Sequence, residues 1–387
     1  MQQKNSSKRL MSLDALRGFD MMWIMGGDLF FKGLAIVCGC PLLQWWAGQM
    51  EHAEWNGFQF FDIIFPLFLF IAGIAFPFSS AKQQQQGISA TQQHLKIVRR
   101  GLTLVLLGLV YNGILAFDFE HLRYASVLAR IGIAWMLAAF IFLHTGKISR
   151  WLWLAALLVG YWLLIALVAA PDAAAVTIPD ALYGKTSADV IAATGNFSLR
   201  GNIVGYIDRM LLPGAMWLEI FDPEGILSTL PAVATALLGM LTGVFVKNNN
   251  CSGSRKALYM LAAAVVLMAL GQCWGIIFPI NKNLWSSSFV CFAGGLSLAL
   301  FALFYYLVDV KNFTRWTFPF RVIGLNSITI YIASMLINIS FIAHSLFGGI
   351  ISVFPAAWAT LLAGLFYTAT CWLLLYFLYR QKLFLKV

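Results

Sequence analysis

The chain has 387 residues and a net charge of +10; 60% of its residues are hydrophobic and only 11% are charged. A soluble domain carries roughly 25% charged residues, so the composition excludes an ordinary soluble protein and indicates an integral membrane protein. The basic residues are dispersed among apolar segments and form neither a patch nor an arm, which argues against a nucleic-acid partner.

Ten apolar segments are each long enough to cross a membrane as a helix. They lie at residues 12–33, 58–80, 97–116, 124–143, 150–170, 226–246, 256–278, 285–308, 320–343 and 354–379. The sequence therefore predicts one all-α integral membrane domain over residues 1–387, a bundle of about ten transmembrane helices. The six cysteines have no metal-ligand spacing, and we expect no metal.

The positive charges between these segments predict the orientation of the bundle. With the N-terminus inside, 18 of the 26 Lys and Arg residues fall on the cytoplasmic side and five fall outside. The cytoplasmic residues are Lys4, Lys8, Arg9, Lys82, Lys96, Arg99, Arg100, Lys147, Arg150, Lys247, Arg255, Lys256, Lys311, Arg315, Arg321, Arg380, Lys382 and Lys386. The outer residues are Arg123, Lys185, Arg200, Arg209 and Lys282. This bias predicts that both termini are cytoplasmic.

The first segment carries ionisable side chains, which are costly inside a membrane and indicate a functional role. Asp14 and Arg17 are three residues apart, so they share a helix face and can pair near the cytoplasmic end; this pair is either a packing clamp or part of a ligand site. Asp28 lies roughly 21 Å beyond Asp14 along a straight helix. We therefore expect Asp28 near the outer face, either exposed to water or beside the outer loop at 34–57.

The polar start of the second segment, residues 50–57, places His52 at the mouth of a membrane helix. Histidine has the ordinary pKa nearest neutrality, so His52 can act as base, acid or nucleophile; the alternative is that it only caps or anchors the helix. Asp28, at a similar depth, can hold the second imidazole nitrogen and fix its tautomer. Asp62 and Arg130 are expected to point into the bundle and line a polar cavity.

The longest outer loop, at 171–224, is expected to fold as a lid, because long structureless loops are uncommon unless they are functional. Carboxylates, amides and an aromatic ring of the kind that bind sugars occur here and in a later outer loop, at Asp222, Glu224, Asn281, Asn283 and Trp285. Each of these is also a common helix cap or interfacial anchor. Asp222 before Pro223, for instance, predicts an N-cap with proline at the first helical position.

Seven motifs, in one order along nearly the whole chain, carry a resemblance to a known family. They are RLMSLDALRGFDMMWIMGGD at 9–28, HAEWNGFQFFDIIFPLFLFIAG at 52–73, LRYASVLARIGIAW at 122–135, NIVGYIDRMLLPG at 202–214, FDPEGILSTLPAVATALLGMLTG at 221–243, INKNLWSSSFV at 280–290 and GLNSITIYI at 324–332. In these motifs the chain resembles the heparan-α-glucosaminide N-acetyltransferase family of multispan membrane acyltransferases, in a compact bacterial form.

The resemblance implies that acetyl-CoA is used from the cytosol and that the amino group of a terminal glucosamine is acetylated on the periplasmic side of the inner membrane. The family's essential histidine falls on His52. Asp28 stands where the animal enzymes have an asparagine, so a carboxylate here would raise the basicity of His52 instead of only orienting it. Asn56, on the following turn, is the expected oxyanion or acceptor ligand.

The donor would reach His52 through a polar funnel from the cytoplasm, with Arg17, Arg130 and Asp14 as its expected contacts. The expected partners are acetyl-CoA, an amino sugar, the lipid bilayer and a second copy of the chain. Two alternatives stay open. One is O-acetylation of a cell-surface polysaccharide, and the other is a transporter that uses the buried charges as an ion relay.

Overall fold

The computed structural model describes residues 10–182, 186–248 and 250–385. These residues form helices and loops, which confirms the predicted all-α membrane fold. Five of the basic residues used above to predict topology lie outside the described residues: Lys4, Lys8, Arg9, Lys185 and Lys386.

Eight helical segments of the described chain are long and apolar enough to cross a membrane. They are Met11–Cys38 (α1 Met11–Met22, η1 Trp23–Gly27 and α2 Asp28–Cys38), Phe60–Gln85 (η2 Phe60–Ile63 and α4 Ile64–Gln85), α6 Val127–His144, α7 Lys147–Leu167, α10 Thr229–Lys247, α11 Gly253–Gly275, Ser287–Val310 (α12 Ser287–Phe304 and η5 Tyr305–Val310) and α16 Ala356–Arg380. A ninth span results if α13 Phe318–Leu325 and α14 Ser327–Leu336, which are bent by 56° from one another, are counted together. Two shorter helices are α3 Pro41–Gln49 and α15 Ile339–Ile351.

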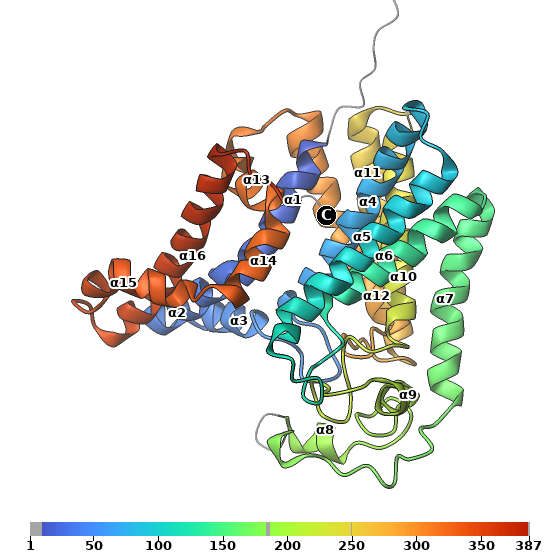
Figure 1. Ribbon diagram of the computed structural model, residues 1–387, viewed down its shortest axis with the longest axis horizontal. Helices are drawn as coiled ribbons and strands as arrows, with labels where there is room; N and C mark the ends of the chain where they lie inside the picture. The colour runs from blue at the N-terminus through green and yellow to red at the C-terminus, as the bar shows by residue number, and fades with distance from the viewer. Residues whose placement is uncertain (1–9, 183–185, 249, 386–387) are drawn as a thin grey trace, which may run out of the picture.

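The expected span at 97–116 is a helix, α5 Ala90–Tyr111, but it is not among these eight. Its first half carries Lys96, Arg99 and Arg100. Three positive charges in so short a segment are costly to bury in lipid, so α5 depends on its packing along α6 (Figure 1).

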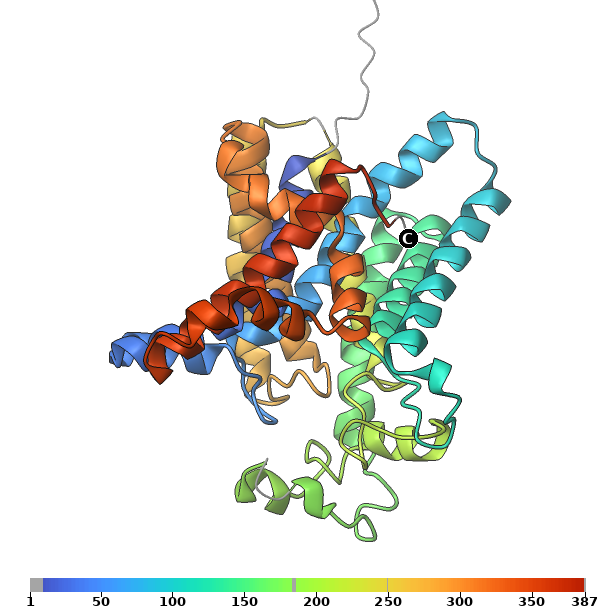
Figure 2. The same cartoon turned by 60° about the vertical axis from the view of Figure 1, so that its left-hand side comes forward.

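The connections between the helices gather at two ends of the bundle (Figures 1 and 2). We call the upper end in Figure 1 the basic end; its connections are 86–89, 145–146, 248–252 and 311–314. We call the lower end the His52 end; its connections are 50–59, 112–126, 168–228 and 276–286. Hydrogen bonds hold the connections of the His52 end together, for example from Gly57 N to Ile280 O at 2.8 Å and from Ala215 N to Leu122 O at 3.1 Å.

The first span is broken at Gly26, which adopts a φ of +102° that glycine tolerates readily. After this break α2 leaves the direction of α1 and packs against α16. At that contact a Cβ built on Gly33 would lie 2.6 Å from the Cα of Leu361, so only glycine allows the approach. As a result α2, α3, α15 and α16 form an arm beside the central helices (Figure 1).

The span Phe60–Gln85 is the most enclosed of the eight. It packs against α10 at a close approach of Gly73 to Gly239. Its first turn, η2, ends the connection that carries His52, so this central span sets the position of both His52 and Asp62.

The described part of residues 168–228 forms a folded cap over the His52 end. Its helices include η4 Asp180–Leu182, α8 Ala188–Ala192 and α9 Ile203–Leu211. Buried side chains of the cap, among them Val204 and Phe221, pack against Trp55 of the His52 connection. The cap therefore has an apolar core of its own, which holds it in place over the helices.

Candidate active site

A cavity of about 710 Å³ lies between the connections of the His52 end and the helices beneath them. Its polar part is lined by Glu54, His52, Arg123, Glu224 and Lys282. Its apolar part reaches into the bundle and is lined by side chains of α1, η1, α4, α6 and α14: Met21, Ile24, Phe65, Phe68, Ile131 and Ile328. Trp217 and Leu218 of the cap form another wall. One space thus joins the polar connections to the interior of the bundle.

His52 is held from behind by the carboxylate of Asp62. Nδ1 of His52 lies 2.7 Å from Oδ1 of Asp62, and Asp62 is fully buried while the His52 side chain is about half exposed (49%). The second oxygen of Asp62 accepts the backbone N–H groups of Gln59 at 2.9 Å and Ala53 at 3.3 Å. The bond from Gln59 forms because Asp62 lies in the first turn of a helix, where backbone N–H groups lack helical partners. The imidazole is therefore fixed in the cavity wall.

The sequence prediction that Asp28 holds the imidazole is wrong in its geometry. Among the described residues, no hydrogen bond joins Asp28 to His52, and the position at Nδ1 belongs to Asp62. The prediction assumed a straight first helix, whereas the chain turns at Gly26 and carries Asp28 into the arm, where it interacts with Lys32. Asp62, predicted to line the cavity, lies behind His52 and is absent from the described cavity wall.

Lys282 approaches the same pair from the connection at 276–286. Its Nζ lies 2.9 Å from Nδ1 of His52 and 3.7 Å from Oδ1 of Asp62. Burial lowers the pKa of the Lys282 ammonium below its ordinary value, and the charge of Asp62 partly offsets this effect. In the sequence Lys282 serves only as a topology charge, although it stands between two predicted sugar ligands, Asn281 and Asn283.

The two partners of Nδ1 select different tautomers of the ring. When Nδ1 donates its proton to Asp62, Nε2 keeps a free lone pair and can accept a proton. When Nδ1 instead accepts from Lys282, Nε2 carries the hydrogen. The charged, buried carboxylate at 2.7 Å favours the first arrangement. In this arrangement Nε2 of His52 is free to accept a proton, and the Lys282 side chain lies beside the ring.

A second charged group lies across the cavity. The guanidinium of Arg123 donates to Asp222 from Nε at 2.7 Å and from Nη2 at 2.6 Å, and it also pairs with Glu224. It lies 5.1 Å from the centre of the exposed Trp217 ring. Arg123, Glu224 and Trp217 line the cavity, whereas Asp222 is fully buried behind them. Neither Arg123 nor Trp217 was selected as a site residue from the sequence.

The predicted helix start at Asp222 is wrong, because α10 begins at Thr229. Asp222 instead accepts the backbone N–H of Trp217 at 3.0 Å and that of Glu224 at 2.9 Å, besides the two bonds from Arg123. An aspartate that accepts from the residue two positions ahead stabilises a turn. Asp222 thus positions Arg123 and does not itself reach the cavity wall.

Asp208 lies beneath the cap as a buried carboxyl. Its Oδ1 accepts the backbone N–H of Ile226 at 2.9 Å, while its Oδ2 has no hydrogen-bond partner among the described residues. Burial, together with the nearby charge of Asp222, raises the pKa of Asp208 from 3.8 to about 7.

Three other predicted sugar ligands or catalytic groups serve the structure. Asn281 is fully buried; its amide donates to Oδ1 of Asn56 at 3.2 Å, and its carbonyl oxygen accepts the N–H of Leu284 at 2.8 Å. Trp285 is buried in the core, where its indole donates to Thr235 at 3.2 Å. The described cavity wall contains none of Asn56, Asn281 and Trp285. They shape the connections that hold His52.

Asn283 lines the cavity, and its role as a sugar ligand stays a prediction. Its amide donates to the carbonyl oxygen of Glu54 at 3.2 Å, and the carboxylate of Glu54 accepts the N–H of Ser187 at 3.2 Å. Through Glu54, these two bonds join the connection at 276–286 to the cap.

The residues expected to contact the donor lie apart from one another. Asp14 and Arg17 form the predicted pair, with 3.6 Å between the charged atoms, near the basic end. Arg130 is buried in the first turn of α6, at the opposite end, where it binds Ser228 and lies over the ring of Trp285. It anchors the start of α10 and is absent from the described cavity wall. A role for Arg17, Arg130 and Asp14 in contacting the donor stays a prediction.

Comparison with known proteins tests the resemblance that the seven sequence motifs indicated. The heparan-alpha-glucosaminide N-acetyltransferase of Homo sapiens is 28% identical to the chain over 414 residues, and that of Mus musculus is 28% identical over 418 residues. Each match covers 92% of this chain. The resemblance predicted from the motifs is confirmed. No family model matches the chain.

The relatives are longer proteins. The chain spans 59% of the length of the human relative and 60% of the length of the mouse relative. Their name states that they transfer an acetyl group to a nitrogen atom of a heparan α-glucosaminide.

Proposed function

We propose that the chain is a membrane acetyltransferase that moves an acetyl group from acetyl-CoA to the amino group of a glucosamine-type sugar. The observation that carries the proposal is the buried Asp62 carboxylate 2.7 Å from Nδ1 of a half-exposed His52 that lines a cavity. A carboxylate at Nδ1 leaves the Nε2 lone pair for a proton, which is the arrangement of a general base. The name of the relatives supplies the transferred group and the class of acceptor.

In the proposed reaction the amine of the sugar attacks the thioester carbonyl carbon of acetyl-CoA. As the C–N bond forms, Nε2 of His52 takes a proton from the nitrogen, and Asp62 stabilises the imidazolium that results. The C–S bond then breaks, and His52 returns the proton to the sulfur of CoA. The products are an N-acetyl sugar and free CoA, and His52 is regenerated.

Lys282 is the group placed to stabilise the oxyanion of this reaction. Its Nζ lies 2.9 Å from Nδ1 of His52, and Lys282 forms part of the cavity wall, which supports this role. A preorganised cation at the developing negative charge is among the larger contributions to acyl transfer. We assign Lys282 the part that the sequence suggested for Asn56.

The polar side of the cavity is suited to a sugar. Trp217 offers an exposed ring for stacking, while Arg123, Glu224 and Asn283 offer hydrogen-bonding groups. The apolar side is suited to the acetylated pantetheine arm, because it reaches from His52 into the bundle toward the break between α13 and α14. In this arrangement the donor enters from the basic end and the sugar from the cap.

The proposal is tested by incubating the purified protein with labelled acetyl-CoA and a panel of amino sugars, followed by detection of N-acetyl product. We expect product from glucosamine and none from glucose, which lacks the amine. His52→Ala should reduce turnover by at least 10²-fold, in the range of general-base catalysis. His121→Ala is the matched control, because His121 is exposed and pairs with Asp118 outside the cavity. Wild-type turnover in His52→Ala would remove His52 from the mechanism.

A further inference from the structure

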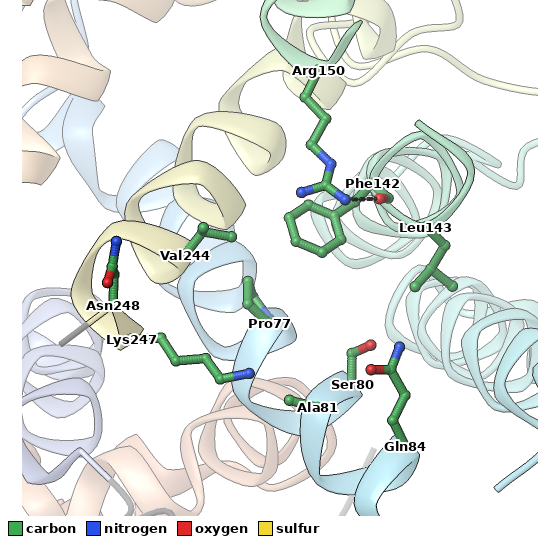
Figure 3. A pocket seen from close by; sticks show the side chains of 10 residues that line it. All are labelled: Pro77, Ser80, Ala81, Gln84, Phe142, Leu143, Arg150, Val244, Lys247 and Asn248. Carbon is green, nitrogen blue, oxygen red and sulfur yellow. Dashed lines mark hydrogen bonds between the residues drawn. The ribbon is translucent and has the colours of Figure 1, made fainter. Parts of the chain in front are cut away.

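A second cavity, of about 480 Å³, lies at the basic end between α4, α6, α7 and α10 (Figure 3). Its lining combines apolar side chains with polar ones: Pro77, Phe142, Leu143 and Val244 with Ser80, Gln84, Arg150, Lys247 and Asn248. None of its lining residues belongs to the cavity at His52. It is therefore a space separate from the His52 cavity.

The lining of this second cavity is positively charged. Arg150 and Lys247 face it, and the lining residues include no carboxylate. Figure 3 shows both side chains reaching toward the space beside Pro77 from different helices. Two cations that converge without a counter-ion among the described lining residues leave a strong preference for an anion.

Arg150 is held ready for such a ligand. Its Nη2 donates to the carbonyl oxygen of Phe142 at 2.7 Å, and its guanidinium lies 3.7 Å from the centre of the Phe142 ring. Its Nε is buried and has no hydrogen-bond partner among the described residues. The side chain is thus fixed in position while part of its donor capacity stays unused.

The position of this second cavity in the bundle indicates which kind of anion it would bind. It lies where four helices end or begin, close to His144, Lys147 and Lys247. In a membrane-spanning bundle these ends lie at the depth of the lipid headgroups. Large apolar side chains at the start of α7, including Trp151 and Leu152, are exposed on the outside of the bundle, where acyl chains would lie.

We propose that this cavity binds the phosphate of an anionic phospholipid headgroup, with Arg150 and Lys247 as its cationic ligands. Basic pockets between membrane helices bind anionic headgroups in this way. The phosphates of CoA have the same chemistry, but the separation from the His52 cavity and the apolar walls favour the lipid.

Native mass spectrometry of the purified protein tests the assignment, with phosphatidylglycerol and phosphatidylcholine of identical acyl chains as the probes. We expect phosphatidylglycerol to bind more tightly, and Lys247→Gln and Arg150→Gln each to weaken its binding about fivefold. Arg255→Gln is the matched control and should bind normally, because Arg255 is an exposed residue in the first turn of α11 at the same end.

Three results would overturn the assignment: equal binding of the two lipids, unchanged binding in Lys247→Gln, or displacement of phosphatidylglycerol by CoA. The last would assign the phosphate site to the nucleotide instead. Lys247 is exposed, so Lys247→Gln is expected to fold normally and keeps the test decisive if Arg150→Gln does not fold.

Discussion

Replacing Asp62 by asparagine is the sharpest perturbation of the His52 site. The carboxylate accepts from Nδ1 of His52 with one oxygen and from the backbone N–H groups of Gln59 and Ala53 with the other. An asparagine has only one acceptor oxygen. If that oxygen keeps the two backbone bonds, the amide NH₂ faces Nδ1 and donates to it. The imidazole then carries its hydrogen on Nε2, and the lone pair that accepts the proton in the reaction is lost.

We expect this wrong tautomer to lower kcat strongly. Aspartate-to-asparagine changes behind a catalytic histidine lower kcat by up to roughly 10⁴-fold, and general-base catalysis as a whole contributes roughly 10²–10⁴-fold. We therefore expect Asp62→Asn to lower kcat by roughly 10²–10⁴-fold, which corresponds to about 3–5 kcal/mol of transition-state stabilisation. Binding of acetyl-CoA should change little, because Asp62 does not line the cavity.

The assay is steady-state transfer from labelled acetyl-CoA to glucosamine, together with a binding measurement for CoA. Asp118→Asn is the matched control, since Asp118 also lies against a histidine, His121, at 3.0 Å but outside the cavity. Asp28→Asn separates the structural assignment from the one based on sequence, and it should retain most of the activity. Near-normal kcat in Asp62→Asn, or an equal loss in Asp28→Asn, would refute the reasoning.

Two further perturbations test neighbouring parts of the site. Lys282→Met removes the cation beside His52 while keeping a long side chain; we expect kcat to fall roughly 10²-fold, as for the loss of an oxyanion donor, and an unchanged kcat would exclude Lys282 from that role. Asp208 has its pKa raised from 3.8 to about 7 by burial, so its contribution to stability is fully present below pH 3.8 and is lost as the pH rises through 7. The free energy of unfolding of the wild type should therefore fall by about 2–3 kcal/mol between pH 5 and pH 7 relative to that of Asp208→Asn, which keeps an acceptor for the N–H of Ile226. The same pH dependence of thermal unfolding in the two proteins over that range would contradict this.

The sequence predicted the fold class, and it singled out His52, which lines the cavity, because both depend on local signals. Long apolar segments identify spans, and a histidine at the polar start of one such segment identifies a candidate base. The Asp14–Arg17 pair was predictable for the same reason, since three-residue spacing on a helix fixes the contact.

The partner of His52 was not predictable in that way. The choice of Asp28 depended on a straight first helix, and one glycine conformation at Gly26 redirects the chain. Asp62 lies only ten residues from His52 in the sequence, but its contact depends on a turn that brings the start of a helix back beneath the connection. No periodic pattern encodes such a turn.

Long-range contacts decide the remaining roles. Lys282 reaches His52 across 230 residues of sequence, and Arg123 reaches Asp222 across 99. In the sequence alone, the charges of Lys282 and Arg123 are as consistent with a role in setting the membrane topology as with a role in the site. Trp285 and Asn281 were selected for their chemistry, whereas packing buries both of them.

The central claim is that an acetyl group passes through the bundle from a donor at the basic end to an amine at the His52 end. The most direct test uses vesicles in which the protein has a single orientation, with labelled acetyl-CoA added only on the side of the basic end and glucosamine present only on the other side. The account predicts N-acetylglucosamine in the compartment that never contained CoA, and none with His52→Ala. Product that forms only when both substrates share one side would contradict it.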